Sequence, residues 1–218
     1  MVYGRKVGDR TLDLEASGAL KAATLIMRDR QTDSWWSIMT ASAIGGPLTG
    51  TSLKELPVSE KTTWKSWRER YPNTLVLSVQ GLEHVENNPY DNYFRSDDTF
   101  RNTAVKDGRL PPKAPIYAFW LEGVAYAVPH SAFAGGKILK APIPGASLLL
   151  ARPVDASIYA SSEAWLVRRE IPPDITPATL LGELKAGTLP GAERLGGFDT
   201  FWYTWVGVNE GSKVLGGD

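Results

Sequence analysis

The sequence predicts an α+β protein that is mainly β, made of two divergent repeats of short strands, each closed by a short helix that carries tryptophans. Glycine and proline are frequent, with 21 and 15 residues in a chain of 218, and they interrupt long helices. Apolar residues tend to alternate along the chain, which is typical of strands. Two tryptophan pairs share the same spacing, Trp64 with Trp67 and Trp202 with Trp205. A chain of this length can bury a sizeable core as one compact unit.

The strands are predicted by short alternating apolar runs. Residues 11–17 place Leu12, Leu14 and Ala16 on one face of a strand. Residues 115–129 read as two strands that turn at Glu122-Gly123. Further strands are expected over residues 147–152 and 157–170.

Two helices are predicted by their end signals. The first covers residues 62–72, with Thr62 or Thr63 as the N-terminal cap and Pro72 as the stop. The second covers residues 176–187, with Thr176 as the cap, Pro177 in the first turn and Gly187 at the end. Each helix is expected to span about three turns or fewer.

A repeat connects the two tryptophan pairs. Residues 62–67 are echoed by residues 200–205, and Val76-Leu77 recurs at the same separation as Val214-Leu215. The glycine-bounded turn at residues 46–50 is echoed by residues 187–191. We expect a first repeat over residues 1–80, a connecting loop region over 81–112 and a second repeat over 113–218, with each tryptophan helix covering a sheet with its aromatic face.

Composition excludes several classes of partner and site. Basic and acidic residues balance at 24 each, so no overall field attracts nucleic acid or an anionic membrane. No window approaches a transmembrane segment, and residues 1–20 lack an apolar signal-peptide core. We therefore expect a cytoplasmic protein as the chain stands, or an exported one if it is a mature or truncated form. Cysteine is absent, which removes disulfides, thiolate metal ligands and cysteine nucleophiles.

Six residues are candidates for ligand binding: Arg28, Arg30, Gln31, Ser34, Trp35 and His84. On a strand Arg28 and Arg30 would share one face, where two guanidiniums could hold a carboxylate or phosphate. The alternative, which we favour, is a polar turn at a strand end in which Asp29 caps backbone N–H groups and one tryptophan seals the core. Because adjacent strand residues face opposite ways, either Trp35 or Trp36 is expected to be exposed.

The sequence gives little support for a metal site or for a known catalytic motif. Asp91, Asp97 and Asp98 lie in an acidic loop that could hold a hard cation, but their spacing differs from a calcium-binding helix–loop–helix. We expect a structural loop, no metal and no cofactor. The two histidines, His84 and His130, lie on separate segments without a zinc-binding pattern, and each is expected to be an ordinary loop residue, with a lone general base as the alternative. Catalytic residues are not assigned, because hydrolase, phosphate-loop and dinucleotide motifs are absent.

Six ordered blocks resemble a prokaryotic domain-of-unknown-function family, number 3179, across nearly the whole chain: DRQTDSWW, GPLTGTSLKELPV, TTWKSWRERYPNTLVLS, NPYDNYFRSDDTF, DGRLPPKAPIYAFWLEGVAYAVP and FDTFWYTW. The resemblance implies an additional N-terminal segment with a Tyr-Cys-Pro-x-Cys-Gly-like motif, often behind an export signal. No residue here matches that motif, so a redox or metal role is not carried over. The resemblance also implies that the first repeat is N-terminally incomplete, whereas the second keeps the equivalent strands from about Pro115 to Arg152.

An incomplete repeat predicts a bare sheet edge, which proteins usually cover. We expect a non-catalytic β-rich binding or assembly module that associates with itself, as a homo-oligomer, or with a protein partner through that edge. The alternative is an enzyme or small-ligand-binding protein with an anion-accepting pocket around the segment Asp29–Thr32.

Overall fold

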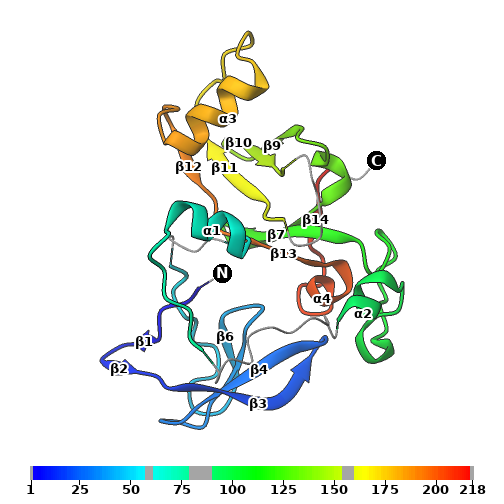
Figure 1. Cartoon of the computed structure of the whole chain (residues 1–218). Helices are drawn as coiled ribbons and strands as arrows, with labels where there is room; N and C mark the ends of the chain where they lie inside the picture. Colours follow the sequence, from blue (N-terminus) through cyan, green and yellow to red (C-terminus); the bar gives the residue numbers. More distant parts are fainter. Residues whose placement is uncertain (1, 57–60, 79–89, 154–159, 217–218) are drawn as a thin grey trace.

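The computed structural model describes residues 2–56, 61–78, 90–153 and 160–216 (Figure 1). Four small sheets and a few short helices make up the chain, which confirms the predicted α+β, mainly β class. No helix in the described ranges has the length and apolar character needed to cross a membrane.

The N-terminal sheet is an antiparallel meander in which each strand pairs with the next. Its strands are β3 (Leu14–Lys21), β4 (Thr24–Asp29), β5 (Trp35–Ser37) and β6 (Ser42–Gly45). A two-stranded ribbon precedes it, formed by β1 (Lys6–Val7) and β2 (Arg10–Thr11). The strand predicted over residues 11–17 is thus divided between β2 and β3, and Ala16 is exposed. Leu12 and Trp36 are at the centre of this small core.

The central sheet has the order β13-β7-β8-β14. Its strands are β7 (Pro115–Leu121), β8 (Val124–Pro129), β13 (Phe198–Phe201) and β14 (Lys213–Val214). The predicted turn at Glu122-Gly123 is confirmed, and both residues have positive φ, 51° and 77°. β14 runs parallel to β8, while the other pairs are antiparallel. The hairpin β7–β8 therefore lies between the two strands from the C-terminal end of the chain.

The C-terminal sheet has the order β12-β11-β10-β9 and is antiparallel. Its strands are β9 (Ile138–Ile143), β10 (Ala146–Ala151), β11 (Glu163–Val167) and β12 (Ala192–Arg194). Between β11 and β12 lies α3 (Pro177–Ala186), which confirms the second predicted helix in its details. Thr176 accepts a hydrogen bond from the Thr179 N–H, and Gly187 ends the helix with φ 69°, a conformation that glycine adopts without strain.

The core is layered in the order α3, C-terminal sheet, central sheet and α4 (Trp202–Val206) (Figure 1). Leu180 and Leu184 of α3 pack on one face of the C-terminal sheet. The other face meets the central sheet, and α4 covers the far side of the central sheet with its two tryptophans. Met39 joins that last cluster, so the N-terminal half packs against the α4 side.

The remaining elements are short: α1 (Trp64–Arg70), α2 (Asp91–Arg95) and the 3₁₀ turns η1 (Phe100–Asn102) and η2 (His130–Phe133). The first predicted helix is confirmed as α1, with Thr63 as its cap. Its predicted packing is wrong, because α1 has no buried residue, whereas all five residues of α4 are buried. The physical reason is that α4 lies against the hairpin β7–β8, and the described first half supplies no such cover for α1. The two repeats themselves remain a prediction.

Candidate functional site

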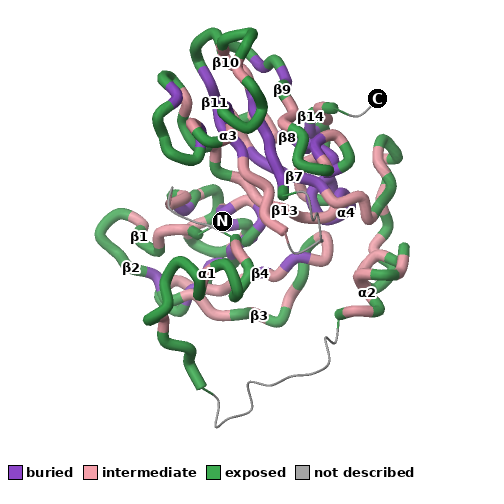
Figure 2. Tube along the Cα trace, turned by 45° about the horizontal axis from the view of Figure 1, so that its top comes forward, coloured by how far each residue is buried: buried purple, intermediate pink, exposed green. Residues whose placement is uncertain are grey.

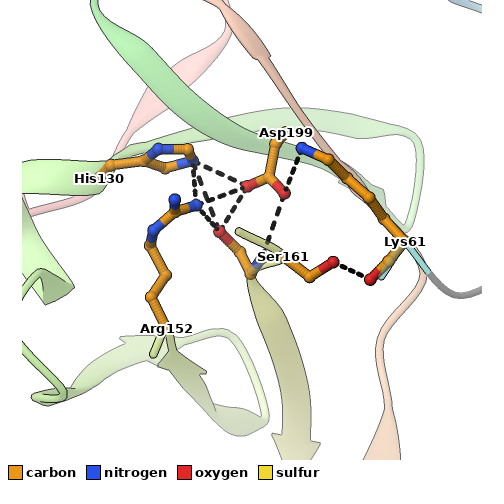
Figure 3. A network of polar contacts seen from close by, with 6 residues as sticks. Lys61, His130, Arg152, Ser161 and Asp199 are labelled. Carbon is orange, nitrogen blue, oxygen red and sulfur yellow. Dashed lines mark hydrogen bonds and ion pairs between the residues drawn. The ribbon is translucent and has the colours of Figure 1, made fainter. Parts of the chain in front are cut away.

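A buried network of charged and polar side chains lies where the central and C-terminal sheets meet (Figure 3). Its members come from the ends of separate elements: Lys61 before α1, His130 at the start of η2, Arg152 after β10, Ser162 before β11 and Asp199 in β13. Strand ends carry these side chains because the interiors of the strands are filled by apolar residues that pack between the layers. Pairing and stacking of the strands then bring His130, Arg152, Ser162 and Asp199 together, while Lys61, which is half exposed, reaches them from the segment before α1.

The Asp199 carboxylate is the centre of this network. Its Oδ1 lies 2.8 Å from His130 Nε2 and 3.1 Å from Arg152 Nη1, and it accepts a hydrogen bond from the Ser162 hydroxyl. Its Oδ2 accepts from the Ser162 backbone N–H at 3.1 Å and lies 3.5 Å from Lys61 Nζ. The Asp199 and Arg152 side chains are only 7% and 1% exposed, so their charges neutralise each other away from water.

The environment shifts the pKa values of this network in a consistent way. Burial by itself raises the pKa of Asp199, but hydrogen bonds from His130 and Ser162 and nearby positive charge outweigh it and lower that pKa to about 2. Burial lowers the pKa of His130, Arg152 adds to that effect, and Asp199 opposes it. At neutral pH we therefore assign an ionised Asp199 and a neutral His130. The short contact to the carboxylate places the imidazole proton on Nε2, since a carboxylate only accepts.

This arrangement does not activate a nucleophile. A serine nucleophile needs a base that accepts its hydroxyl proton. Here the Ser162 hydroxyl donates to Asp199, its Oγ accepts from Arg152 Nη1 at 2.7 Å, and His130 Nε2 is 3.4 Å away. The imidazole nitrogen that faces Ser162 already donates to Asp199. The network therefore ties chain segments together by neutralising buried charge.

The free energy of unfolding is expected to fall as the pH is lowered from about 7.5 to about 5, and His130 is the reason. Because the pKa of His130 is lower in the folded protein than its ordinary value of about 6.5, the unfolded chain binds the proton more readily. The stability linked to neutral His130 is present above that ordinary value and is lost below it. Urea unfolding measured across this range checks the sign, with a slope of at most about 1.4 kcal/mol per pH unit from one proton.

His130→Gln is the control for this pH profile, since glutamine does not titrate. The variant is expected to have a flatter profile over the same range, although its stability at neutral pH is lower. A profile that is unchanged in His130→Gln would contradict the assignment of the slope to this imidazole. Asp199 adds a separate loss of stability, which begins as the pH falls towards the ordinary aspartate pKa of about 3.9 and is complete below the folded value of about 2.

A cavity of about 540 Å³ adjoins the network. Its wall includes Lys61, Ser162 and Asp199, and two glycines, Gly196 and Gly197, in the link between β12 and β13. A Cβ at Gly196 would lie 2.7 Å from the Glu55 carboxylate, and one at Gly197 would lie 2.6 Å from the Tyr117 ring. These glycines therefore let the link pass close to its neighbours. The cavity has the size of a small-molecule site and carries charges of both signs, from Lys61, Arg194, Glu55, Glu163 and Asp199.

The candidate segment around Asp29 forms a closed polar turn. Asp29 is fully buried and accepts hydrogen bonds from the Trp36 indole N–H at 2.8 Å and from the Thr32 backbone N–H at 2.6 Å. These hydrogen bonds hold the pKa of Asp29 below its ordinary value although burial opposes them. Trp35 is 42% exposed and Trp36 is 2% exposed, which confirms that one of the pair faces outwards.

The candidate ligand-binding side chains in this segment already have partners. Arg28 lies 2.5 Å from Asp33 and Arg30 lies 2.7 Å from Glu15, while Gln31 donates to Asp13. Neither guanidinium faces the cavity beside Asp199, and these contacts support the scaffold interpretation.

Ser34 has a structural contact of its own. It is buried, and its Oγ accepts from the Leu48 N–H at 3.0 Å. A Cβ at Gly46 would lie 2.7 Å from Ser34 Cα. This close approach explains why the turn over residues 46–50 begins with glycine.

The acidic loop provides no assembled cation site in the described part of the chain. Asp91 forms an ion pair with Arg95 at 3.0 Å, and the described residues contain no group of three or more histidines or carboxylates that could hold a metal. The candidate His84 lies outside the described residues. Asp97 and Asp98 follow the short helix α2 without joining Asp91 in such a group.

A second candidate surface is exposed. It consists of α1, whose residues are mostly polar, and the segment that follows it, residues 74–78, whose three central residues are apolar. Leu75, Val76 and Leu77 are 94%, 59% and 89% exposed, and Trp64 on α1 is 49% exposed. Figure 2 shows α1 as exposed, in contrast to the buried α4. Contiguous exposed apolar residues are uncommon on a free surface and often mark a binding site.

The sequence does not reveal the members of the buried network. His130 was expected to be an ordinary loop residue, with a lone general base as the alternative; the first is wrong, because His130 is buried and contacts Asp199. The sequence predicted no role for Lys61, Arg152, Ser162 or Asp199. One signal was available for Arg152, because an arginine that directly follows the apolar run Leu148–Ala151 must find a buried partner or leave the sheet. The identity of that partner depends on the pairing of distant strands.

Comparison with known proteins gives one match. The family model described as "Protein of unknown function (DUF3179)" matches residues 1–211. No curated protein and no solved structure shows significant similarity to the chain.

Proposed function

We propose that this chain, which belongs to the DUF3179 family of proteins of unknown function, is a non-catalytic β-rich binding or assembly module that associates with itself or with a partner through an incomplete sheet edge. The observation that carries the proposal is the exposed run Leu75-Val76-Leu77 that follows α1, together with the exposed Trp64 on that helix. Exposing these side chains to water is unfavourable, and covering them with another polypeptide would release about 25 cal/mol per Å² of apolar surface.

The polar network supports a structural role rather than chemistry in this proposal. Its carboxylate accepts hydrogen bonds from the imidazole, the guanidinium and the hydroxyl group, and its imidazole is neutral and buried. In this proposal the network holds the central and C-terminal sheets in register. The exposed surface formed by α1 and residues 74–78 is thereby kept in a fixed position.

Light scattering over a wide range of protein concentration, together with binding of an apolar fluorescent dye, tests this function. We expect either a mass that rises with concentration or a monomer that binds the dye. Val76→Asp should remove the rise in mass or the dye binding, whichever is observed. Leu20→Asp, at another exposed apolar position, should leave it unchanged. A monomer that binds no dye would contradict the proposal.

A second candidate function is the binding of a small polar ligand in the cavity beside Asp199. The observation that favours it is a buried carboxylate in the wall of a 540 Å³ cavity, with Lys61 and Arg194 nearby. In this second candidate the ligand pocket lies beside Asp199, and not around the segment Asp29–Thr32 that the sequence suggested. A thermal-shift screen of small carboxylates, phosphates and polyols would test it, and Arg194→Ala should abolish any shift. A screen without a stabilising compound would argue against this function.

A further inference from the structure

The two segments with the repeated tryptophan pattern also share backbone hydrogen bonds. We call residues 62–77 the first unit and residues 200–215 the second unit. In the first unit, Tyr71 N–H donates to Trp67 O at 2.8 Å and Thr74 N–H donates to Tyr71 O at 3.1 Å. In the second unit, the residues 138 positions later make the same bonds: Asn209 N–H to Trp205 O at 3.0 Å, and Ser212 N–H to Asn209 O at 3.2 Å. Both units therefore contain a helix followed by the same turn, and their residues correspond one to one.

The apolar surface of the second unit is covered by the hairpin β7–β8. Trp202 and Trp205 are 0% exposed and pack against Ile116, Ala118 and Ala127 of that hairpin. Beyond the turn, β14 pairs in parallel with β8, and the Leu215 N–H donates to the Ala127 carbonyl at 3.0 Å. On the other side, β13 pairs with β7. The hairpin thus fills the space between the two ends of the unit and covers the indoles of its helix.

The same surface of the first unit has no such cover. Trp64 corresponds to buried Trp202, and Val76 and Leu77 correspond to Val214 and Leu215. Within the described residues no strand pairs with Leu75–Leu77, and α1 has no buried residue. The two units therefore differ in the one element that would bury these side chains.

The outer edge of β3, which lies at one end of the N-terminal sheet, is less suited to a partner strand. The register of β3 shifts between Ala16 and Leu20, and Glu15 on this strand pairs with Arg30. A bulge and charged side chains are the usual means by which proteins protect an edge strand from further pairing. The first unit lacks such protection, since Leu75, Val76 and Leu77 are all apolar.

We infer that the first unit binds a β-hairpin of a separate partner polypeptide, with one strand of the hairpin running parallel to Leu75–Leu77. This inference rests on the proposed binding function and names its site and the chemistry of its partner. The face of the hairpin turned towards α1 carries small and branched apolar side chains, as Ile116, Ala118 and Ala127 do towards α4. The carbonyl of its paired strand accepts from the Leu77 N–H, as Ala127 does from Leu215.

A second copy of this chain is not the occupant. The hairpin of the required kind, β7–β8, is buried in its own core, where Ile116, Ala118 and Phe119 are fully buried between the central sheet and its neighbours. Lending that hairpin to another molecule would unfold the lender. The exposed hairpin β3–β4 carries the bulge described above.

The test uses the full chain and a synthetic peptide with the sequence of residues 115–129, held as a hairpin by a disulfide between added terminal cysteines and made soluble by added lysines. We expect saturable binding with one peptide per chain and slower hydrogen exchange at the Leu77 amide. Val76→Asp and Leu75→Asp should each weaken binding by about tenfold or more, because binding would bury an unpaired carboxylate. Leu20→Asp is the matched control and should bind as the parent chain does.

The possible outcomes distinguish a failure of the inference from a failure of the proposed function. Absence of saturable binding, or equal binding by Val76→Asp, overturns the inference. A concentration-dependent dimer of the chain alone that Val76→Asp dissociates also overturns it, because the occupant is then a second copy, while the binding function itself stands. A monomer that binds neither peptide nor apolar dye removes both. Because Leu75 and Val76 are exposed, both variants are expected to fold, which circular dichroism verifies.

Discussion

Replacement of Asp199 by alanine is expected to lower the free energy of unfolding by about 3–5 kcal/mol, because it removes the buried carboxylate whose charge offsets that of the Arg152 guanidinium. Arg152 is 1% exposed and lies 3.1 Å from the carboxylate, so the loss falls on a charge that is shielded from bulk water. His130 and Ser162 lose the same acceptor. Urea unfolding at neutral pH measures the effect.

A surface ion pair provides the control for Asp199→Ala. Asp91 and Arg95 are 3.0 Å apart but 48% and 78% exposed, and such pairs contribute only about 0–1 kcal/mol. Asp91→Ala should therefore leave the free energy of unfolding almost unchanged. If Asp199→Ala were as mild as Asp91→Ala, the network would not hold the layers together.

The pair Asp199→Ala and Arg152→Met provides a second check, because methionine fills the space of the arginine stem without its charge. The double variant is expected to be more stable than the sum of the two single losses predicts, since it removes both charges of the Asp199–Arg152 ion pair, whereas each single change removes only one of them. Strict additivity would mean that the two side chains do not interact in the folded protein.

The elements decided by local chemistry could be predicted from the sequence. The bounds of α3 were predicted by three residues that each favour one position in a helix: Thr176 as the cap, Pro177 in the first turn and Gly187 at the end. Glu122-Gly123 fixed the hairpin β7–β8 in the same way, since its turn needs two residues with positive φ. The adjacent tryptophans predicted one exposed and one buried ring from strand alternation alone.

The buried network and the setting of α1 could not be predicted in this way. His130, Arg152 and Asp199 are far apart in sequence, and their meeting depends on which strands pair and how the two sheets stack. The tryptophan motif of α1 is nearly that of α4, yet its exposure depends on whether a hairpin lies against it. Local patterns determine the helix, whereas its burial is a property of the surrounding chain.

The tryptophans at equivalent positions of the two helices are expected to differ sharply in their contribution to stability. Trp202→Ala should lower the free energy of unfolding by about 3–5 kcal/mol, because it removes a fully buried indole and leaves a cavity between α4 and the central sheet. It also removes the hydrogen bond from the indole N–H to the Asp107 carbonyl. Trp64→Ala should change it by no more than about 0.5 kcal/mol, since half of that side chain already faces water. Chemical denaturation of the two variants under identical conditions measures the difference.

The same pair of variants separates stability from binding. If the exposed surface of the first unit receives a hairpin, Trp64→Ala should weaken binding of the peptide with the sequence of residues 115–129 while leaving the unfolding curve unchanged. Trp202→Phe, which keeps an aromatic ring against the hairpin β7–β8, should recover part of the stability lost in Trp202→Ala. A large loss of stability in Trp64→Ala would mean that α1 is already covered within the chain, and the exposed surface on which the binding proposal depends would not exist.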